Sequence, residues 1–480
     1  MPKLQALVIF VCAFGPRAIL SALEPAKSGD WTVYETVALN ILNNGCVSLS
    51  DPGAGTCVPH WGGNHLPGFP AFVALVWKFT DRVWLPVALA HSAVFAISAS
   101  YLFVALRRAL PSPGTAFLCA LIVALSPLTL PWARFTLSET LALSVVVCIT
   151  ADLCRSVAER KLRIFPLAAM MAVGLFIRYD LALLALPIAF IGFIVHPFRS
   201  AIQRGVLMIV IISIPLGAWW ARSVASGLGA TPPLYFLGNG YAAPKGYLEW
   251  AETWATNQYQ APEWWYPIHF AAYSDIIIDE SAYTSIDERN KIKELLVRLE
   301  DFDGKQFPME IDLEFARIAA AKRAATPLNH WLWLPVLRIG RIWINPYNSG
   351  GWPVALGWTG GTLSFETAFE FLRQNPGSIL VKGATAAYRI GILIVATVLL
   401  LLTFRQRATF ASIILWAAML HTVGRTVFLG WGFFIESRYL LEVIPMLEVA
   451  VVMTIAEFSG RNAPTGIIAR IRGDAWGETS

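Results

Sequence analysis

About ten apolar runs dominate the sequence, and they limit what the chain can fold into. They cover residues 4–22, 83–106, 113–131, 137–154, 164–177, 181–196, 205–224, 385–403, 408–426 and 438–457. A helix needs roughly 20 apolar residues to cross a bilayer, and helices satisfy their own backbone groups there. Of the 480 residues 56% are apolar and only 14% are charged, which excludes an aqueous globule. The sequence therefore predicts an all-α polytopic membrane protein with about ten transmembrane helices.

The Lys and Arg residues predict the orientation of these helices. They gather in alternate loops, after residues 106, 154, 196, 403 and 457. Because cytoplasmic loops carry an excess of Lys and Arg, we expect both termini in the cytoplasm of a bacterial inner membrane. The segments predicted on the periplasmic side are 23–82, 132–138, 178–180, 225–384 and 427–437.

The same pattern divides the chain into four parts. We expect an N-terminal transmembrane module (1–224) with a first periplasmic loop (23–82), a periplasmic and interfacial segment (225–384), C-terminal transmembrane helices (385–457) and a cytoplasmic tail (458–480). Residues 288–302 and 310–325 have apolar side chains at helical spacing, so the second part is predicted to be α-rich. Residues 67–80 and 329–348 are predicted to be helices that lie in the membrane interface.

The polar loop after the first apolar run holds two cysteines, Cys46 and Cys57. In an oxidising compartment two cysteines in one loop favour a disulfide, and two free thiols are the alternative. Asp30 stands near the start of this loop, just outside the first helix. An acid there is placed to act as a general base on an acceptor hydroxyl, or to hold a divalent cation. The alternative is the N-cap of the helix that begins at Trp31.

Further charged residues lie at the predicted outer ends of the apolar runs. Glu139 and Arg134 flank a very short outward turn, where charges are costly unless they are paired or functional. A helix cap for Glu139 and a snorkelling side chain for Arg134 are the alternatives. Arg178 and Arg438 lie at two other outer ends. Several arginines converging on one face would suit a lipid-linked phosphate, although Arg178 can also simply pair with Asp180.

The order of these features resembles a known family, the polytopic GT-C glycosyltransferases. Asp30 is followed by Tyr34, and His65 precedes Pro67-Gly68-Phe69-Pro70; segments 126–143, 176–180 and 436–445 resemble further elements of that family. The similarity is to the bacterial branch related to protein O-mannosyltransferases and the lipid A aminoarabinose transferase. One departure is that those lipid A transferases carry Lys-Pro-Pro where this chain has His65-Leu66-Pro67, and histidine is only partly charged at neutral pH.

The resemblance implies an inverting transfer of one hexose or pentose from a polyprenyl-phosphate donor. The acceptor would be a glycan, a lipid or a protein on the periplasmic face. Asp30 would be the general base and Glu139 a second catalytic acid. His65, Arg134, Arg178 and Arg438 would hold the donor phosphate, and Tyr34, His60 and Tyr439 would line the substrate groove. No cofactor is certain, and a divalent cation stays open.

Two other classes of protein stay open at this point. One is a lipid-linked sugar flippase or transporter, which would need polar residues deep within several spans. The other is an O-antigen ligase or polymerase that uses a diphosphate carrier. The polar residues gather instead at the outer ends of the runs, and the early Asp30 favours the glycosyltransferase. The net charge of +5 comes from short loops rather than from a basic stripe, so no nucleic acid partner is expected.

Overall fold

The computed structural model describes residues 2–23, 30–55, 57–60, 66–228, 244–256, 278–299, 307–344, 373–374, 376–404, 408–432 and 436–460. In these ranges the chain is helical, and the one strand-like contact is an isolated antiparallel bridge between Ser48 and Pro59. Seven helices of the described chain are long and apolar enough to cross a membrane. The chain is therefore an all-α multi-pass membrane protein.

The seven long helices match seven of the predicted runs. They are α1 (Pro2–Leu23), α4 (Trp84–Ala109), α6 (Glu139–Ala158), α9 (Phe198–Ala225), α16 (Pro376–Phe404), α17 (Phe410–Trp431), and α18 (Ile444–Gly460) with the preceding turn η8 (Ser437–Val443). The other three predicted runs are shorter apolar helices: α5 (Pro113–Leu125), α7 (Ile164–Ile177), and η2 (Tyr179–Leu184) joined to α8 (Ala185–Val195).

The predicted run 113–131 ends earlier than expected. Helix α5 stops at Leu125, and the chain then turns into the short helix η1 (Leu130–Arg134). Pro127 and Pro131 explain this end, because proline disfavours helical geometry in the residue before it and lacks a backbone donor. The turn brings Arg134 and Glu139 close to the same end of the bundle.

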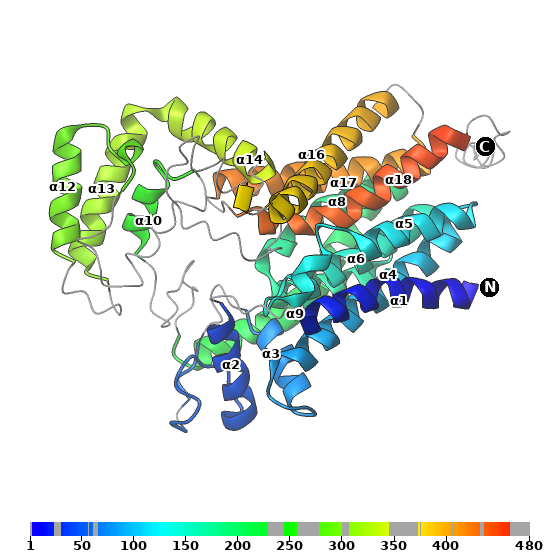
Figure 1. Cartoon of the computed structure of the whole chain (residues 1–480), viewed down its shortest axis with the longest axis horizontal. Helices are drawn as coiled ribbons and strands as arrows, with labels where there is room; N and C mark the ends of the chain where they lie inside the picture. Colours follow the sequence, from blue (N-terminus) through cyan, green and yellow to red (C-terminus); the bar gives the residue numbers. More distant parts are fainter. Residues whose placement is uncertain are drawn as a thin grey trace.

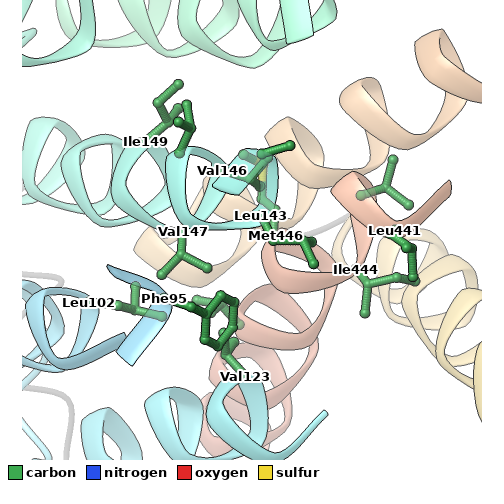
Figure 2. Packing of buried hydrophobic residues seen from close by; sticks show 14 of the residues in the cluster. Phe95, Leu102, Val123, Leu143, Val146, Val147, Ile149, Leu441, Ile444 and Met446 are labelled. Atoms are coloured by element: carbon green, nitrogen blue, oxygen red, sulfur yellow. The ribbon is translucent and has the colours of Figure 1, made fainter. Parts of the chain in front are cut away.

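The core of the bundle lies where α4, α5, α6 and α18 meet. Phe95 from α4, Val123 from α5, Val147 from α6 and Met446 from α18 point into one closely packed layer (Figure 2). All four side chains are buried. Most side chains that these helices bury against one another are apolar, as expected for helices in the centre of a membrane protein.

A second, smaller core belongs to the segment between α9 and α16. Helices α10 (Lys245–Ala251), α12 (Ile286–Val297) and α13 (Met309–Ala325) bury Tyr247, Trp250, Leu295 and Phe315 against one another. We call these three helices the external unit. Figure 1 shows it beyond one end of the bundle, while the start of α1 and the end of α18 lie at the other end. The described helices of the predicted α-rich segment therefore form a packed unit.

Helix α14 (Leu334–Ile344) joins the external unit to the bundle. Buried Arg338 donates hydrogen bonds to the carbonyl oxygen of Ala255, at 3.0 Å, and to that of Gly430 at the end of α17, at 3.5 Å. Trp343 Nε1 donates to Thr426 Oγ1 at 3.1 Å. Helix α14 is thus fixed to the outer end of α17.

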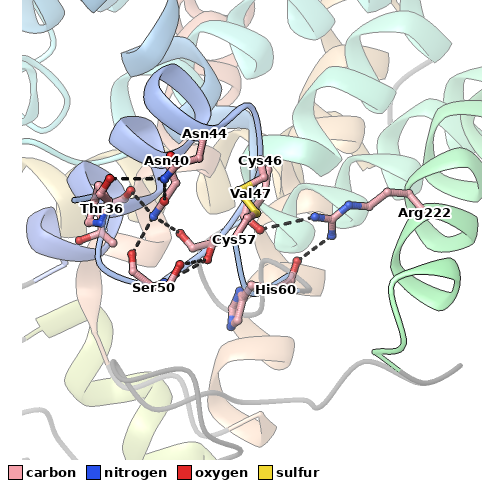
Figure 3. Close-up of a disulfide and its surroundings, with 11 residues drawn as sticks. Thr36, Asn40, Asn44, Cys46, Val47, Ser50, Cys57, His60 and Arg222 are labelled. Atoms are coloured by element: carbon pink, nitrogen blue, oxygen red, sulfur yellow. Dashed lines mark hydrogen bonds between the residues drawn. A yellow bond between two sulfur atoms is a disulfide. The ribbon is translucent and has the colours of Figure 1, made fainter. Parts of the chain in front are cut away.

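The loop after helix α2 (Trp31–Asn44) is tied together at several points (Figure 3). Cys46 and Cys57 are joined by a disulfide. Asn40 Nδ2 donates to the carbonyl oxygen of Ser50 at 2.8 Å, and Arg222 of α9 donates to the carbonyl oxygen of His60 at 3.0 Å. These contacts hold the far end of α2 against the bundle.

Helix α3 (Gly68–Trp77) packs directly on the end of α7, and this contact gives a testable prediction. A Cβ added at Gly68 would lie 2.5 Å from the backbone oxygen of Phe176, two residues before Arg178. We therefore expect Gly68→Ala to lower the free energy of unfolding by about 1–3 kcal/mol, through overpacking. Thermal unfolding of the detergent-purified protein, followed by circular dichroism, would measure it.

Gly205→Ala on α9 is the matched control, because nothing lies within 4 Å of a Cβ there. Alanine in a helix interior is favoured over glycine by about 1 kcal/mol, so this variant should unfold at the same temperature or higher. Equal unfolding temperatures for Gly68→Ala and the wild type would contradict the close packing.

Candidate active site

Arg438 connects three acidic residues that are far apart in the sequence. Its Nη1 lies 3.3 Å from Asp30 Oδ2, and its Nε lies 3.8 Å from Glu139 Oε1 and contacts Glu436. Arg438 belongs to η8, Glu139 begins α6, and Asp30 precedes α2. The site therefore forms only when the segments at the starts of α2, α6 and α18 come together.

Asp30 occupies the N-cap position of α2, but its side chain accepts no capping hydrogen bond from the first turn. The carboxylate instead faces Arg438 and is 36% exposed. A capping carboxylate would be committed to backbone N–H groups. Here the carboxylate lies against a guanidinium and keeps part of its surface exposed, as an acid that meets a substrate needs to.

A buried network of charges lies behind Asp30. Arg178 contacts Glu139 at 3.2 Å, Asp180 at 2.9 Å and Glu442 at 3.2 Å. Arg425 of α17 contacts the same Asp180 at 2.6 Å and the same Glu442 at 2.9 Å. Removing one member of such a network leaves an uncompensated buried charge, so the network holds α6, η2, α17 and η8 in fixed relative positions.

Carboxylates outnumber guanidinium groups in this site. Three arginines (Arg178, Arg425 and Arg438) face five carboxylates (Asp30, Glu139, Asp180, Glu436 and Glu442), which gives a formal charge of −2 if all are ionised. Burial raises the pKa of Glu436 above its ordinary value, although the guanidinium of Arg438 acts in the opposite direction. These carboxylates offset the positive charges of Arg178 and Arg438, the two arginines of this network that were predicted to hold the donor phosphate.

The two predicted groove tyrosines have different environments. The hydroxyl of Tyr439 accepts a hydrogen bond from Arg438 at 3.3 Å, and its ring lies 5.0 Å from the guanidinium carbon of Arg178. Tyr34 is buried, with its ring edge-to-face against Phe69 at 4.8 Å between centroids. Tyr439 thus supports the arginines, whereas Tyr34 packs α2 onto α3.

Arg134 is fully buried in η1, and side chains of α1 and α4 hold its backbone. Trp84 Nε1 donates to the carbonyl oxygen of Arg134 at 3.1 Å. The carbonyl oxygen of Ala133 accepts from Ser21 at 3.1 Å and from His91 Nε2 at 2.7 Å, so that this nitrogen of His91 carries the proton. The turn that carries Arg134 therefore has little freedom to move.

Lys382 of α16 is a second buried cation at this place, and the sequence did not indicate it. The positive charges of Arg134 and Lys382 act unfavourably on each other, so the two groups lie within electrostatic range. Buried cations can add charge-assisted hydrogen bonds to an anion such as a phosphate.

His65, His60 and the predicted cation are the remaining parts of the predicted site. His65 lies outside the described residues. His60 belongs to the disulfide loop, where its backbone oxygen bonds to Arg222. Within the described chain, no group of three or more His, Cys, Asp or Glu side chains is arranged to hold a metal ion.

Sequence reasoning missed Lys382 and Glu442 as members of the site. Glu442 had a usable signal: it follows Arg438 by four residues inside an apolar run, where an ionisable group indicates a partner or a function. Lys382 had no usable sequence signal, because a single lysine just before an apolar run is typical of a side chain that extends to the membrane surface.

No protein-family model matches the chain, and a search of curated proteins finds no match. Among solved structures the chain is similar to the crystal structure of ArnT from Cupriavidus metallidurans bound to undecaprenyl phosphate. The sequence identity is 15%, the TM-score is 0.36, and the similarity covers 95% of this chain and 77% of that one. The side chains of the site, rather than this similarity, carry the functional proposal.

Proposed function

We propose that this protein is a membrane glycosyltransferase that moves a single sugar from a polyprenyl-phosphate donor to an acceptor. The observation that carries the proposal is the partly exposed carboxylate of Asp30, held by Arg438 at the edge of a buried charge network. The order of motifs that resembles the GT-C glycosyltransferases supports the same reaction class. The site would face the periplasm from a bacterial inner membrane, with the acceptor a glycan, a lipid or a protein.

Asp30 is the general base in this proposal. The acceptor O–H bond breaks, its proton passes to the carboxylate of Asp30, and its oxygen bonds to the anomeric carbon of the sugar. The bond from that carbon to the phosphate oxygen breaks on the opposite face, so the configuration inverts and polyprenyl phosphate leaves with the electron pair. Arg438 donates a hydrogen bond to Asp30 Oδ2 at 3.3 Å and so fixes the direction of the carboxylate.

Arg134 and Lys382 are the proposed site for the donor phosphate. Negative charge builds on the departing phosphate in the transition state, and fixed cations in a buried place stabilise that charge. Arg178 and Arg438 are less suited to this role because carboxylates surround them. Their proposed role is to orient Asp30 and Glu139.

The phosphate site gives a prediction for Lys382→Met. A charge-assisted hydrogen bond contributes about 1.5–3 kcal/mol, so the variant should bind a polyprenyl phosphate roughly 10–100-fold more weakly. Binding of undecaprenyl phosphate to the purified protein in nanodiscs, followed by native mass spectrometry, would measure it. Lys382→Arg should keep most of the affinity.

Lys322→Met is the matched control, since Lys322 is also a buried lysine but lies in the external unit, 3.3 Å from Glu288. It should leave lipid-phosphate binding unchanged. If Lys382→Met and the wild type bind the lipid phosphate equally well, Lys382 does not belong to the phosphate site. The role of Asp30 as the base is tested separately, by sugar transfer.

The sequence left open a divalent cation at Asp30, and a chelator can test whether sugar transfer needs one. Loss of transfer on adding EDTA, with recovery on adding Mg²⁺ or Mn²⁺, would indicate a cation held jointly by Asp30 and substrate oxygens. Unchanged transfer in EDTA would favour the base acting alone.

A further inference from the structure

A group of exposed apolar side chains lies between the external unit and the bundle. It comprises Leu328, Trp331, Leu332, Trp333 and Val336, which are 44% to 77% exposed. They lie in the π-helical turn η6 (Asn329–Trp333), the residue before it and the first turn of α14. We call this group the tryptophan turn.

The opposite face of the same segment is firmly packed. Leu334 and Arg338 are buried, and Ile339 fits so closely over Gly430 of α17 that an added Cβ would lie 2.7 Å from it. The orientation of the segment is therefore fixed, and the tryptophan turn is the face that points away from the protein.

The tryptophan turn continues the outer surface of a membrane span. Leu420, Val423, Val427 and Trp431 form an exposed apolar stripe at helical spacing along α17. The last of them, Trp431, donates its Nε1 hydrogen to the backbone oxygen of Trp331 at 3.1 Å. At about 1.5 Å per residue α17 is roughly 33 Å long, close to the thickness of a bilayer core, so its end marks the membrane surface.

The exposed surface of the external unit is different, because its exposed apolar side chains (Ile286, Val297, Met309 and Leu313) include no tryptophan and stand among charged residues. Its outer faces carry ion pairs such as Arg289–Glu280, Lys291–Glu294 and Arg317–Glu314. Such pairs suit water, whereas tryptophan is enriched where a protein meets the lipid headgroups. The exposed side chains thus change from ion pairs on the external unit to tryptophans in the tryptophan turn, which lies beside the end of α17.

We propose that the tryptophan turn is a membrane-docking surface that lies in the headgroup region of the bilayer leaflet on the side of the external unit. It does not depend on the proposed glycosyl transfer. Since α14 is bonded both to the external unit and to α17, docking here holds the external unit at a set height above the membrane.

A spin label at Leu332 tests the proposal directly. The free cysteines Cys12, Cys119, Cys148 and Cys154 would be replaced by serine or alanine, and Leu332→Cys labelled in the full-length protein in phosphatidylcholine nanodiscs. Oxygen collects in lipid and a nickel chelate stays in water, so the label should relax strongly with oxygen and weakly with nickel. A label at Val297, also exposed but on α12, should show the reverse.

A second labelling position keeps the test valid if the Leu332→Cys variant fails to fold. The same measurement with Leu328→Cys should also report lipid. Labels at 328 and 332 that behave like the label at Val297 would overturn the proposal. A short distance between the labels of two chains, measured by pulsed dipolar spectroscopy in nanodiscs, would overturn it in favour of a second copy of the chain on this face.

Discussion

Asp30→Asn is expected to reduce sugar transfer by roughly 100- to 10,000-fold, the range that a positioned general base contributes. Asparagine keeps the size and the hydrogen-bonding oxygen of the side chain but cannot take up a proton. Asp30 is partly exposed and its pair with Arg438 is not deeply buried, so the free energy of unfolding should change by about 1 kcal/mol or less. Initial rates of transfer by the purified variant would measure the effect.

Asp51→Asn is the control for this result. Asp51 is an exposed acid of the same loop, and its carboxylate accepts only a local hydrogen bond from the backbone N–H of Gly53 at 2.8 Å. Its replacement should leave transfer at the wild-type rate. An Asp30→Asn protein that transfers sugar at the wild-type rate would exclude Asp30 as the base.

Arg425→Met is expected to destabilise the fold by about 3–5 kcal/mol, the cost of leaving buried charges without a partner. Arg425 is fully buried and faces both Asp180 and Glu442, and its Nε also donates to the backbone oxygen of Tyr439. The variant should also lose activity, because the turn η8 that carries Arg438 is held by these contacts. Thermal unfolding in detergent micelles would measure the stability.

A surface pair provides the comparison for Arg425. Arg289 and Glu280 are 2.8 Å apart but largely exposed, so Arg289→Met should cost about 1 kcal/mol or less. Adding Asp180→Asn and Glu442→Gln to Arg425→Met should restore part of the stability, since no uncompensated charge is then left. Arg425→Met and Arg289→Met unfolding at the same temperature would contradict the buried network.

The transmembrane helices were predictable because a segment that lies in lipid must be apolar along most of its length, and this is visible in the sequence. Seven long apolar runs are seven helices, and the loops with Lys and Arg follow alternate runs. Helix ends were less predictable, as at Leu125, where two prolines stop an otherwise apolar run. The sequence also predicted helices in 288–302 and 310–325, but not that they share one core with α10.

The site was predictable as a set of residues on one side of the membrane, but not as a set of contacts. Topology alone places Asp30, Glu139, Arg178 and Arg438 at the outer ends of their spans. The partner of each charge depends on how the helices pack, and residues as far apart as Asp30 and Arg438 share no local pattern. The contact between Arg425 and Asp180 could not be predicted for the same reason, since helix packing rather than a sequence pattern brings them together.

The measurement that tests the central claim most directly is transfer of radiolabelled sugar by the purified protein in nanodiscs. Matched panels of polyprenyl monophosphate and polyprenyl diphosphate sugars would be offered together with a membrane extract as acceptor. The proposal predicts that a monophosphate donor labels an extract product, that free polyprenyl phosphate is released in equal amount, and that Asp30→Asn abolishes both. Transfer from diphosphate donors alone would identify a ligase or polymerase. Movement of intact donor across the bilayer without any transfer would identify a flippase, and either result would contradict the account.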